Sequence, residues 1–194
     1  MSKNSGTRSG LLWEVERLLN EVDELPQVLV MENVPQVHST KNMTDFQSWL
    51  DFLEKKGYKT YWKDLKAYEY GIPQLRKRCI AVSILGNYEY EFPQTVSLSK
   101  VMKDYLEDSV DDKYYVVSDK AKTLIDKLLA DGTINPTVER ESIVLQNLAS
   151  ADENRHPNAY KTDIAVTLLS RDCHGLSNYG SNGVIECQKL NPDF

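Results

Sequence analysis

The feature that most constrains the fold is a change of apolar periodicity along the first half of the chain. Apolar residues recur at steps of three and four over residues 11–22, which predicts an amphipathic helix. A continuous apolar run at 28–31 predicts a strand buried on both faces. A second helical pattern ends at Gly57, and segments 58–65 and 79–85 predict two further strands. This order of helices and strands indicates an α/β fold.

The character of the sequence changes after Gly86. Residues 98–106 and 118–129 both have helical periodicity, and Ser118 or Asp119 is a suitable N-cap for the second of these helices. Between these two segments, residues 114–117 could form a short strand. We therefore expect an irregular region that combines short helices with a few strands.

Residues 131–158 show little periodicity, whereas 164–169 and 183–187 are candidate strands. Between these two candidates lies a segment rich in glycine, serine and asparagine, which favour turns. We divide the chain on this basis into two domains, residues 1–86 and residues 87–194.

Charge is distributed unevenly between the two parts. Residues 1–86 carry 12 basic and 11 acidic side chains, whereas residues 87–194 carry 11 basic and 18 acidic ones. A surface that binds nucleic-acid phosphates normally shows an excess of Lys and Arg. Any DNA contact in the second part must therefore depend on a local cluster or on the remainder of a larger protein.

Composition limits the location and the cofactors of the protein. No apolar run approaches the ~20 residues that span a membrane, and the first residues lack the apolar core of a signal peptide. We expect a cytoplasmic protein with no membrane partner.

The cysteines do not indicate a metal site. Cys79, Cys173 and Cys187 have no CxxC spacing, which argues against a disulfide framework or a zinc site, and we expect no metal. The alternative to this expectation is a partial metal site formed by Cys173, His174 and Cys187.

Glu32 is the first candidate for chemistry, because it follows the apolar run at 28–31. A carboxylate at the C-terminal end of a parallel strand lies where open α/β sheets form their ligand crevice. If this carboxyl group is shielded from water, its pKa should rise and it could carry a proton. The alternative is a structural glutamate that caps a helix. Asn33 is expected to fix the loop and is a candidate for substrate binding.

Gln74, Arg76 and Arg78 form the second candidate group. Alternate positions on an extended segment point to one face, and two guanidinium groups there could bind a phosphate or a pyrimidine carbonyl. The alternative is a solvated basic stretch at the start of a strand. The combination is specific: Glu-Asn-Val ends one strand, and Tyr-Gly-Ile-Pro-Gln-x-Arg-x-Arg leads into another.

With these two motifs, residues 5–86 resemble the DNA (cytosine-5) methyltransferase family. Residues 7–14 resemble its block after the catalytic loop, where Leu11 would line the adenine pocket of S-adenosylmethionine; alternatively, Leu11 is a core residue. The resemblance implies the C-terminal part of a Rossmann-like methyltransferase domain. It also implies S-adenosylmethionine as cofactor and double-stranded DNA as substrate, with the target cytosine flipped out of the duplex.

The resemblance assigns roles to the two motifs. Glu32 would contact the N3/N4 edge of the cytosine, and Arg78 its carbonyl. Arg76 would be the third catalytic residue, and together with Gln74 it would support Arg78 and contact the DNA backbone.

Residues 87–194 would be an incomplete target-recognition region of irregular α+β structure. Asn178, Tyr179, Ser181 and Asn182 lie in a loop that could read base edges in the major groove. A surface loop without contact to DNA is the alternative.

Several family motifs are missing from the sequence. These are the Phe-x-Gly-x-Gly turn that binds S-adenosylmethionine, the Pro-Cys nucleophile and the late Arg-x-x-Thr-x-x-Glu block. Cys79 cannot replace the nucleophile, because it lies in the strand of the arginine motif and is expected to be a buried, inert thiol.

We therefore expect a fragment or split subunit of a restriction–modification DNA cytosine-5 methyltransferase. It should be inactive alone, because nucleophilic catalysis needs an activated thiolate. A second chain would then supply the missing blocks. The alternatives are a non-catalytic DNA-binding or regulatory subunit and a decayed remnant.

Overall fold

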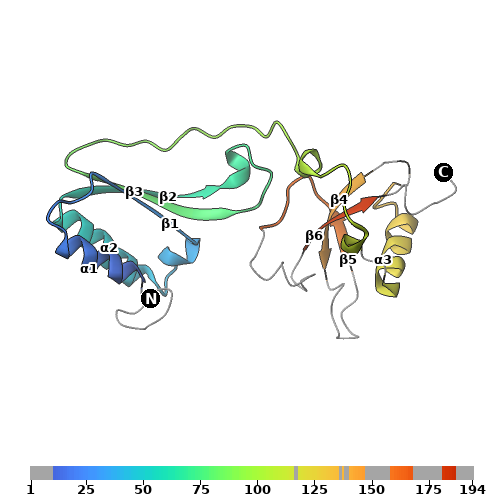
Figure 1. The fold of residues 1–194 in the computed structure, drawn as a ribbon, viewed down its shortest axis with the longest axis horizontal. Coiled ribbons are helices and arrows are strands. Elements are labelled where there is room, and N and C mark those ends of the chain that lie inside the picture. Colours follow the sequence, from blue (N-terminus) through green and yellow to red (C-terminus); the bar gives the residue numbers. More distant parts are fainter. Residues whose placement is uncertain are drawn as a thin grey trace. The chain divides into compact units, whose positions relative to one another are not determined.

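The computed structural model describes residues 11–115, 118–135, 137, 140–146, 158–167 and 181–186. The chain divides into two compact units (Figure 1). The first unit consists of residues 1–66 and 77–95, and the second of residues 67–76 and 96–194. Each unit contains its own three-stranded sheet. The fold is thus a mixture of helix and sheet, as the sequence predicts.

The first unit packs two helices against one sheet. Its elements are α1 (Leu11–Glu21), β1 (Val28–Asn33), the short 3-10 helix η2 (Pro35–His38), α2 (Met43–Lys55), β2 (Tyr58–Lys66) and β3 (Lys77–Leu85). The strand order is β1-β3-β2, and both neighbours pair with β3 in antiparallel orientation. In Figure 1 both helices lie on the same side of this sheet. The predicted helices and strands of this region are confirmed.

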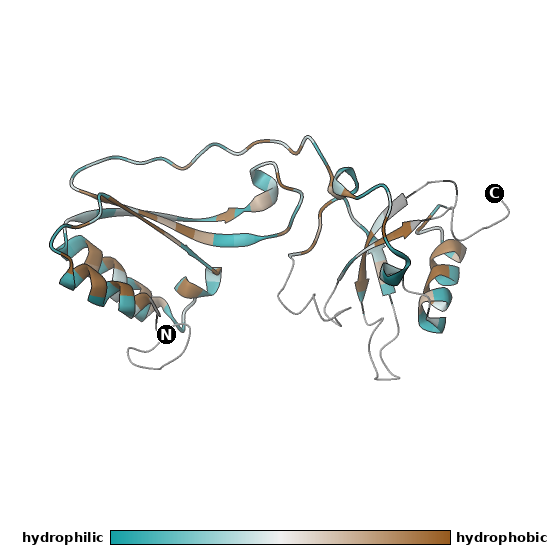
Figure 2. Ribbon diagram, in the orientation of Figure 1, coloured by the Kyte–Doolittle hydropathy of each residue, from teal (hydrophilic) through white to brown (hydrophobic). Residues whose placement is uncertain are grey.

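Side chains from both helices and β2 form the core of the first unit. Leu19 of α1, Trp49 and Leu53 of α2, and Tyr58 of β2 make one buried cluster. Figure 2 shows apolar residues along β1 and β3, while polar and apolar faces alternate around the two helices. Gly57 ends α2 with φ +91°, a left-handed conformation that glycine adopts without strain, so the predicted C-terminal glycine is confirmed.

The expectation that β1 is buried on both faces is wrong for this chain. Leu29 and Met31 pack toward the helices, but Val28 and Val30 are 48% and 69% exposed. Successive strand residues point to opposite faces of a sheet. Among the described residues, helices cover only one of these faces, so every second residue of β1 remains accessible.

The second unit packs one helix against an antiparallel sheet of order β5-β4-β6. Its elements are η3 (Ala67–Glu69), η4 (Met102–Tyr105), η5 (Asp112–Tyr114), α3 (Asp119–Ala130), β4 (Arg140–Gln146), β5 (Asn158–Lys161) and β6 (Ser181–Glu186). Leu124 and Leu128 of α3 are buried with Ile134, Ile143 of β4 and Ile185 of β6. None of the helices in the described ranges of either unit is long and apolar enough to cross a bilayer.

Predictions for the second unit agree with the structure in part. The helix at 118–129 is confirmed as α3, with Ser118 as its N-cap. The helix at 98–106 is reduced to the single turn η4. The strand at 183–187 corresponds to β6, although Cys187 lies outside the described residues.

Two further differences concern strands. At 164–169 the structure shows only an isolated bridge between Ala165 and Gln74, and residues 168–169 are outside the described ranges. Strands β4 and β5 lie in or next to the stretch without periodicity, and the sequence did not indicate them. Both depend on partners that are distant in the sequence, which local patterns do not report.

Candidate functional site

Glu32 and Arg78 meet at one end of the first unit's sheet. Glu32 is the penultimate residue of β1, and Arg78 is the second residue of β3. Ile80 lies directly opposite Glu32, and Arg78 is two positions from Ile80, so both side chains share one face. The Arg78 Nε donates a hydrogen bond of 2.7 Å to Glu32 Oε1. The fold thus joins an acid and a cation that are far apart in the sequence by a charge-assisted hydrogen bond.

The surroundings of Glu32 differ from our expectation. Its side chain is 52% exposed, and β1 pairs with β3 in antiparallel orientation, so no parallel neighbour of β1 is present among the described strands. The expected water-shielded carboxyl group is therefore absent from the chain by itself. Arg78 is more enclosed, at 22% exposed, and its Nη1 also donates to the Lys77 carbonyl at 2.8 Å.

Asn33 and Leu11 occupy positions that agree with part of the prediction. The Asn33 Oδ1 accepts the backbone N–H of Val34 at 2.8 Å, so this side chain helps to shape the loop after β1. Leu11 is the first residue of α1. Contact of Asn33 with substrate and of Leu11 with the cofactor both stay predictions.

Gln74 and Arg76 belong to the second unit, whereas Arg78 belongs to the first. Within the second unit, Gln74 forms a β-bridge with Ala165, and the Ala165 N–H donates to the Pro73 carbonyl at 2.8 Å. The segment that carries Arg76 is thus anchored by backbone hydrogen bonds. The expected common face of the three side chains stays a prediction.

The predicted DNA-reading loop needs a correction at Ser181 and Asn182. Both residues lie in β6 rather than in a loop, because the pairing of β6 with β4 begins at Ser181. The Asn182 Oδ1 accepts the Val166 N–H at 2.8 Å, and its Nδ2 donates to the Val166 carbonyl at 3.1 Å. Asn182 therefore ties β6 to the segment after β5. Asn178 and Tyr179 lie outside the described residues.

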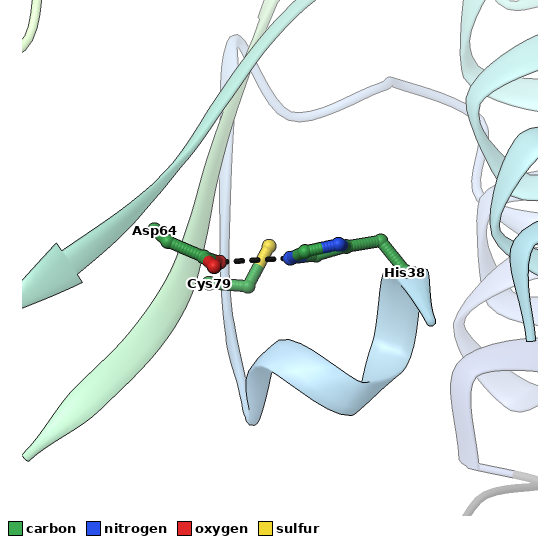
Figure 3. Close-up of side chains that lie close together, drawn as sticks. All are labelled: His38, Asp64 and Cys79. Carbon is green, nitrogen blue, oxygen red and sulfur yellow. Dashed lines mark hydrogen bonds and ion pairs between the residues drawn. The ribbon is translucent and has the colours of Figure 1, made fainter. Parts of the chain in front are cut away.

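A second cluster of polar side chains was not predicted from the sequence. His38 of η2, Asp64 of β2 and Cys79 of β3 bring their nitrogen, oxygen and sulfur atoms within 4.8 Å of one another (Figure 3). The distance from His38 Nε2 to Asp64 Oδ1 is 2.8 Å, and Lys77 Nζ lies 2.8 Å from Asp64 Oδ2. Asp64 and Cys79 are direct register partners, so only knowledge of the strand pairing could have revealed the cluster.

This environment changes the pKa of two groups. Burial opposes ionisation of Asp64, but hydrogen bonds from Lys77 and His38 outweigh burial and hold the pKa of Asp64 below its usual value. Burial, with a smaller contribution from the Asp64 charge, raises the pKa of Cys79 to about 11. The Cys79 thiol is therefore protonated at neutral pH, in agreement with the expected inert thiol.

Comparison with known proteins identifies the family. The model of the C-5 cytosine-specific DNA methylase family matches residues 2–183, so the chain belongs to this family, as its motifs predict. It is 40% identical over 114 residues to the Type II methyltransferase M2.ScrFI of Lactococcus lactis subsp. cremoris, covering 58% of this chain and 31% of that protein. It is 38% identical over 115 residues to the orphan methyltransferase M.SssI of Spiroplasma monobiae, covering 58% and 30%.

The chain thus spans about a third of the length of these two relatives. Among solved structures, a methyltransferase of Entamoeba histolytica covers 62% of this chain and 36% of its own, with 20% identity and a TM-score of 0.48. The Dnmt2 methyltransferase of S. pombe covers 66% and 41%, with 22% identity and the same TM-score.

Proposed function

We propose that this chain supplies the cytosine-holding acid and arginine of a DNA cytosine-5 methyltransferase, and that it works only with a second polypeptide. The observation that carries this proposal is the Glu32–Arg78 pair, joined at 2.7 Å across β1 and β3. Family membership supports the reaction class. The pair supports the roles, because an acid and a guanidinium on one face can bind adjacent polar groups of one base.

In the proposed reaction these residues prepare the base for attack. Addition of a thiolate to C6 makes C5 nucleophilic, and a hydrogen bond or a proton at N3 makes that addition easier. Glu32 would act at the N3/N4 edge, while Arg78 would hold the base carbonyl and orient Glu32. Because Glu32 is half exposed in this chain, DNA and the second polypeptide would have to exclude water from it.

Two observations argue that the chain does not methylate DNA alone. The sequence contains no Pro-Cys pair, and Cys79 is a buried thiol with a pKa of about 11, so it offers no activated thiolate at neutral pH. The sequence also lacks the Phe-x-Gly-x-Gly turn that binds S-adenosylmethionine in this family, so the second polypeptide would have to supply most of the cofactor site, with Leu11 as the contribution of this chain.

The apolar composition of the edge strand β1 supports the proposed need for a second polypeptide. Exposed sheet edges are normally protected by charged residues. The other edge strand, β2, carries Lys59, Lys63 and Lys66, whereas the run 28–31 in β1 is entirely apolar. A strand of this composition suits a position inside a larger sheet. Since the matched segment covers only about a third of each of these relatives, we propose that the polypeptide with the missing blocks covers β1.

The test is methyl transfer from labelled S-adenosylmethionine to cytosine-containing duplex DNA. The purified chain should give none. Addition of a polypeptide that carries the Phe-x-Gly-x-Gly and Pro-Cys blocks, sought first in the neighbouring genomic DNA, should restore transfer. In the mixture, E32Q should reduce the rate by about 10²–10⁴-fold, the usual contribution of a proton-transfer group.

The control for E32Q is E54Q, which removes an exposed carboxylate on α2 and should leave transfer unchanged. Transfer by the chain alone would contradict the proposed need for a second polypeptide. Full activity of the E32Q mixture would contradict the role of Glu32. Duplex binding without restored transfer would favour a non-catalytic subunit.

A further inference from the structure

We infer that His38, Asp64 and Cys79 form a binding site for one divalent cation of the Zn²⁺ type. The three residues come from three separate elements, η2, β2 and β3, and their donor atoms lie within 4.8 Å of one another. In Figure 3 the three side chains point toward one another between these elements. This inference does not depend on the proposed methyltransferase function.

The donor set defines the class of cation. An imidazole nitrogen, a carboxylate oxygen and a thiolate sulfur are the three kinds of protein ligand that Zn²⁺ accepts. Thiolate disfavours Mg²⁺ and Ca²⁺, which prefer sites made of oxygen alone. Cys79 is fully buried, but the side chains of His38 and Asp64 are 23% and 18% exposed, so the cluster is open to solvent on their side. Water can supply the fourth ligand.

Packing around His38 holds its ring in place. The ring centroid lies 5.0 Å from that of Trp62 and 6.2 Å from that of Phe46. Its Nε2 is the atom that faces Asp64. A ring restrained in this way loses little freedom when it binds a cation, which favours binding.

The carboxylate is held from its far side. Lys77 Nζ lies 2.8 Å from Asp64 Oδ2, while Oδ1 faces His38. Ligands of a metal ion are commonly oriented by a further hydrogen-bond partner of this kind. Asp64 lies directly opposite Cys79 in the β2–β3 pairing, so backbone hydrogen bonds fix the distance between these two residues.

Binding is balanced in charge and in protons. The cation replaces the proton of the Cys79 thiol, which leaves to solvent, and a sulfur–metal bond forms. The proton on His38 Nε2, which Asp64 Oδ1 accepts in the metal-free protein, moves through solvent to Nδ1, and Nε2 and the Asp64 carboxylate then each form a bond to the cation. Two positive charges then meet one carboxylate and one thiolate, so the cluster is neutral apart from Lys77.

The bound cation would stabilise the region that carries Glu32 and Arg78 without contacting either residue. His38 closes the short segment after β1, and Cys79 follows Arg78 in β3. Neighbouring strand residues point to opposite faces, so Cys79 faces the helix side while Arg78 faces the other side. The cation would therefore fix η2 against β2 and β3 in a structural role.

The experiment is titration of the full chain with Zn²⁺ and with Co²⁺ after treatment with chelator and reductant. It uses a C173A/C187A background, so that Cys79 is the remaining thiol. We expect one Zn²⁺ per chain, a thiolate-to-cobalt absorption band and a raised Tm with Zn²⁺. C79S should lose the band. H38Q removes a ligand and should bind at least about 10–100-fold more weakly, since loss of an outer hydrogen-bond partner of a ligand already has that effect.

E54Q is the matched control and should bind as the background does, because Glu54 is exposed on α2. Circular dichroism without metal shows whether each variant is folded, and H38Q gives an independent readout should C79S be unfolded. The inference fails if the C173A/C187A protein binds no Zn²⁺, or if C79S and H38Q both keep the cobalt band and the affinity of the C173A/C187A protein.

Discussion

At Asp64, two opposing effects of the fold act on one carboxyl group. Burial favours the neutral form, but Lys77 and His38 both hydrogen-bond to the charged form and prevail. We predict that D64N lowers the free energy of unfolding by about 1.5–3 kcal/mol at neutral pH, the range for hydrogen bonds to charged groups. Urea unfolding of both proteins in the presence of a chelator measures this difference without metal.

The lowered pKa of Asp64 also sets the pH dependence of this difference. A carboxyl group whose pKa is lower in the folded state stabilises the fold above its unfolded pKa, which is about 4 for aspartate. The contribution is lost as pH falls through the folded value. The stability difference between wild type and D64N should therefore shrink below about pH 4. The same difference at pH 3 and pH 7 would show that it is not electrostatic.

Cys79 should be unreactive in the folded protein. Its raised pKa of about 11 leaves about 0.1% thiolate at pH 8, and the side chain has no exposed surface. We predict that iodoacetamide modifies Cys79 at least about 100-fold more slowly in the native, metal-free protein than in urea. Mass spectrometry of the peptide containing Cys79 measures both rates. Equal rates would mean that the strand opens faster than the reagent reacts.

At the scale of single elements, the start of α3 shows how a side chain sets a helix boundary. The Ser118 Oγ accepts the Ala121 N–H at 3.2 Å, which satisfies one of the donors left free in the first turn. S118A should destabilise the second unit by about 1 kcal/mol, and S118D should restore most of it. Urea unfolding followed by circular dichroism tests both variants. An S118A protein as stable as wild type would show that this cap is unimportant.

Elements with a local signal could be predicted from the sequence. Helices α1, α2 and α3 and strands β1 to β3 follow from apolar spacing and from Gly57 and Ser118. Strand β4 could not be predicted, because Ser142, Ile143 and Val144 are all buried and no alternation marks the strand. The helix expected at 98–106 does not form, since the Met102 N–H donates to the distant Asp163 carbonyl.

The two polar clusters also differ in how far the sequence could predict them. Glu32 and Arg78 could be proposed together because each lies near the end of a strand and family motifs contain both. Their hydrogen bond depends on the β1–β3 pairing, which the structure supplies. His38, Asp64 and Cys79 meet only through the β2–β3 register and the position of η2, and neither is encoded in a short motif.

At the scale of the whole molecule, the unprotected strand β1 should govern association. Val28 and Val30 expose apolar surface on β1, which has no second strand partner among the described residues, and such an edge is a template for pairing with another chain. Without its proposed second polypeptide, the purified chain should pair with itself through β1. We predict self-association that increases with concentration, measured by sedimentation velocity.

A single substitution distinguishes association through β1 from association through exposed apolar surface in general. V30K places a charge on the strand, as Lys59 and Lys63 do on β2, and should shift association to at least about 10-fold higher concentration. Its own fold should change little, because Val30 is 69% exposed. V22K is the matched control, since Val22 is 44% exposed near the end of α1. If V22K suppresses association equally, exposed apolar surface in general is responsible. If V30K has no effect, β1 is not the contact. The argument for a second polypeptide on this edge would then lose its physical support.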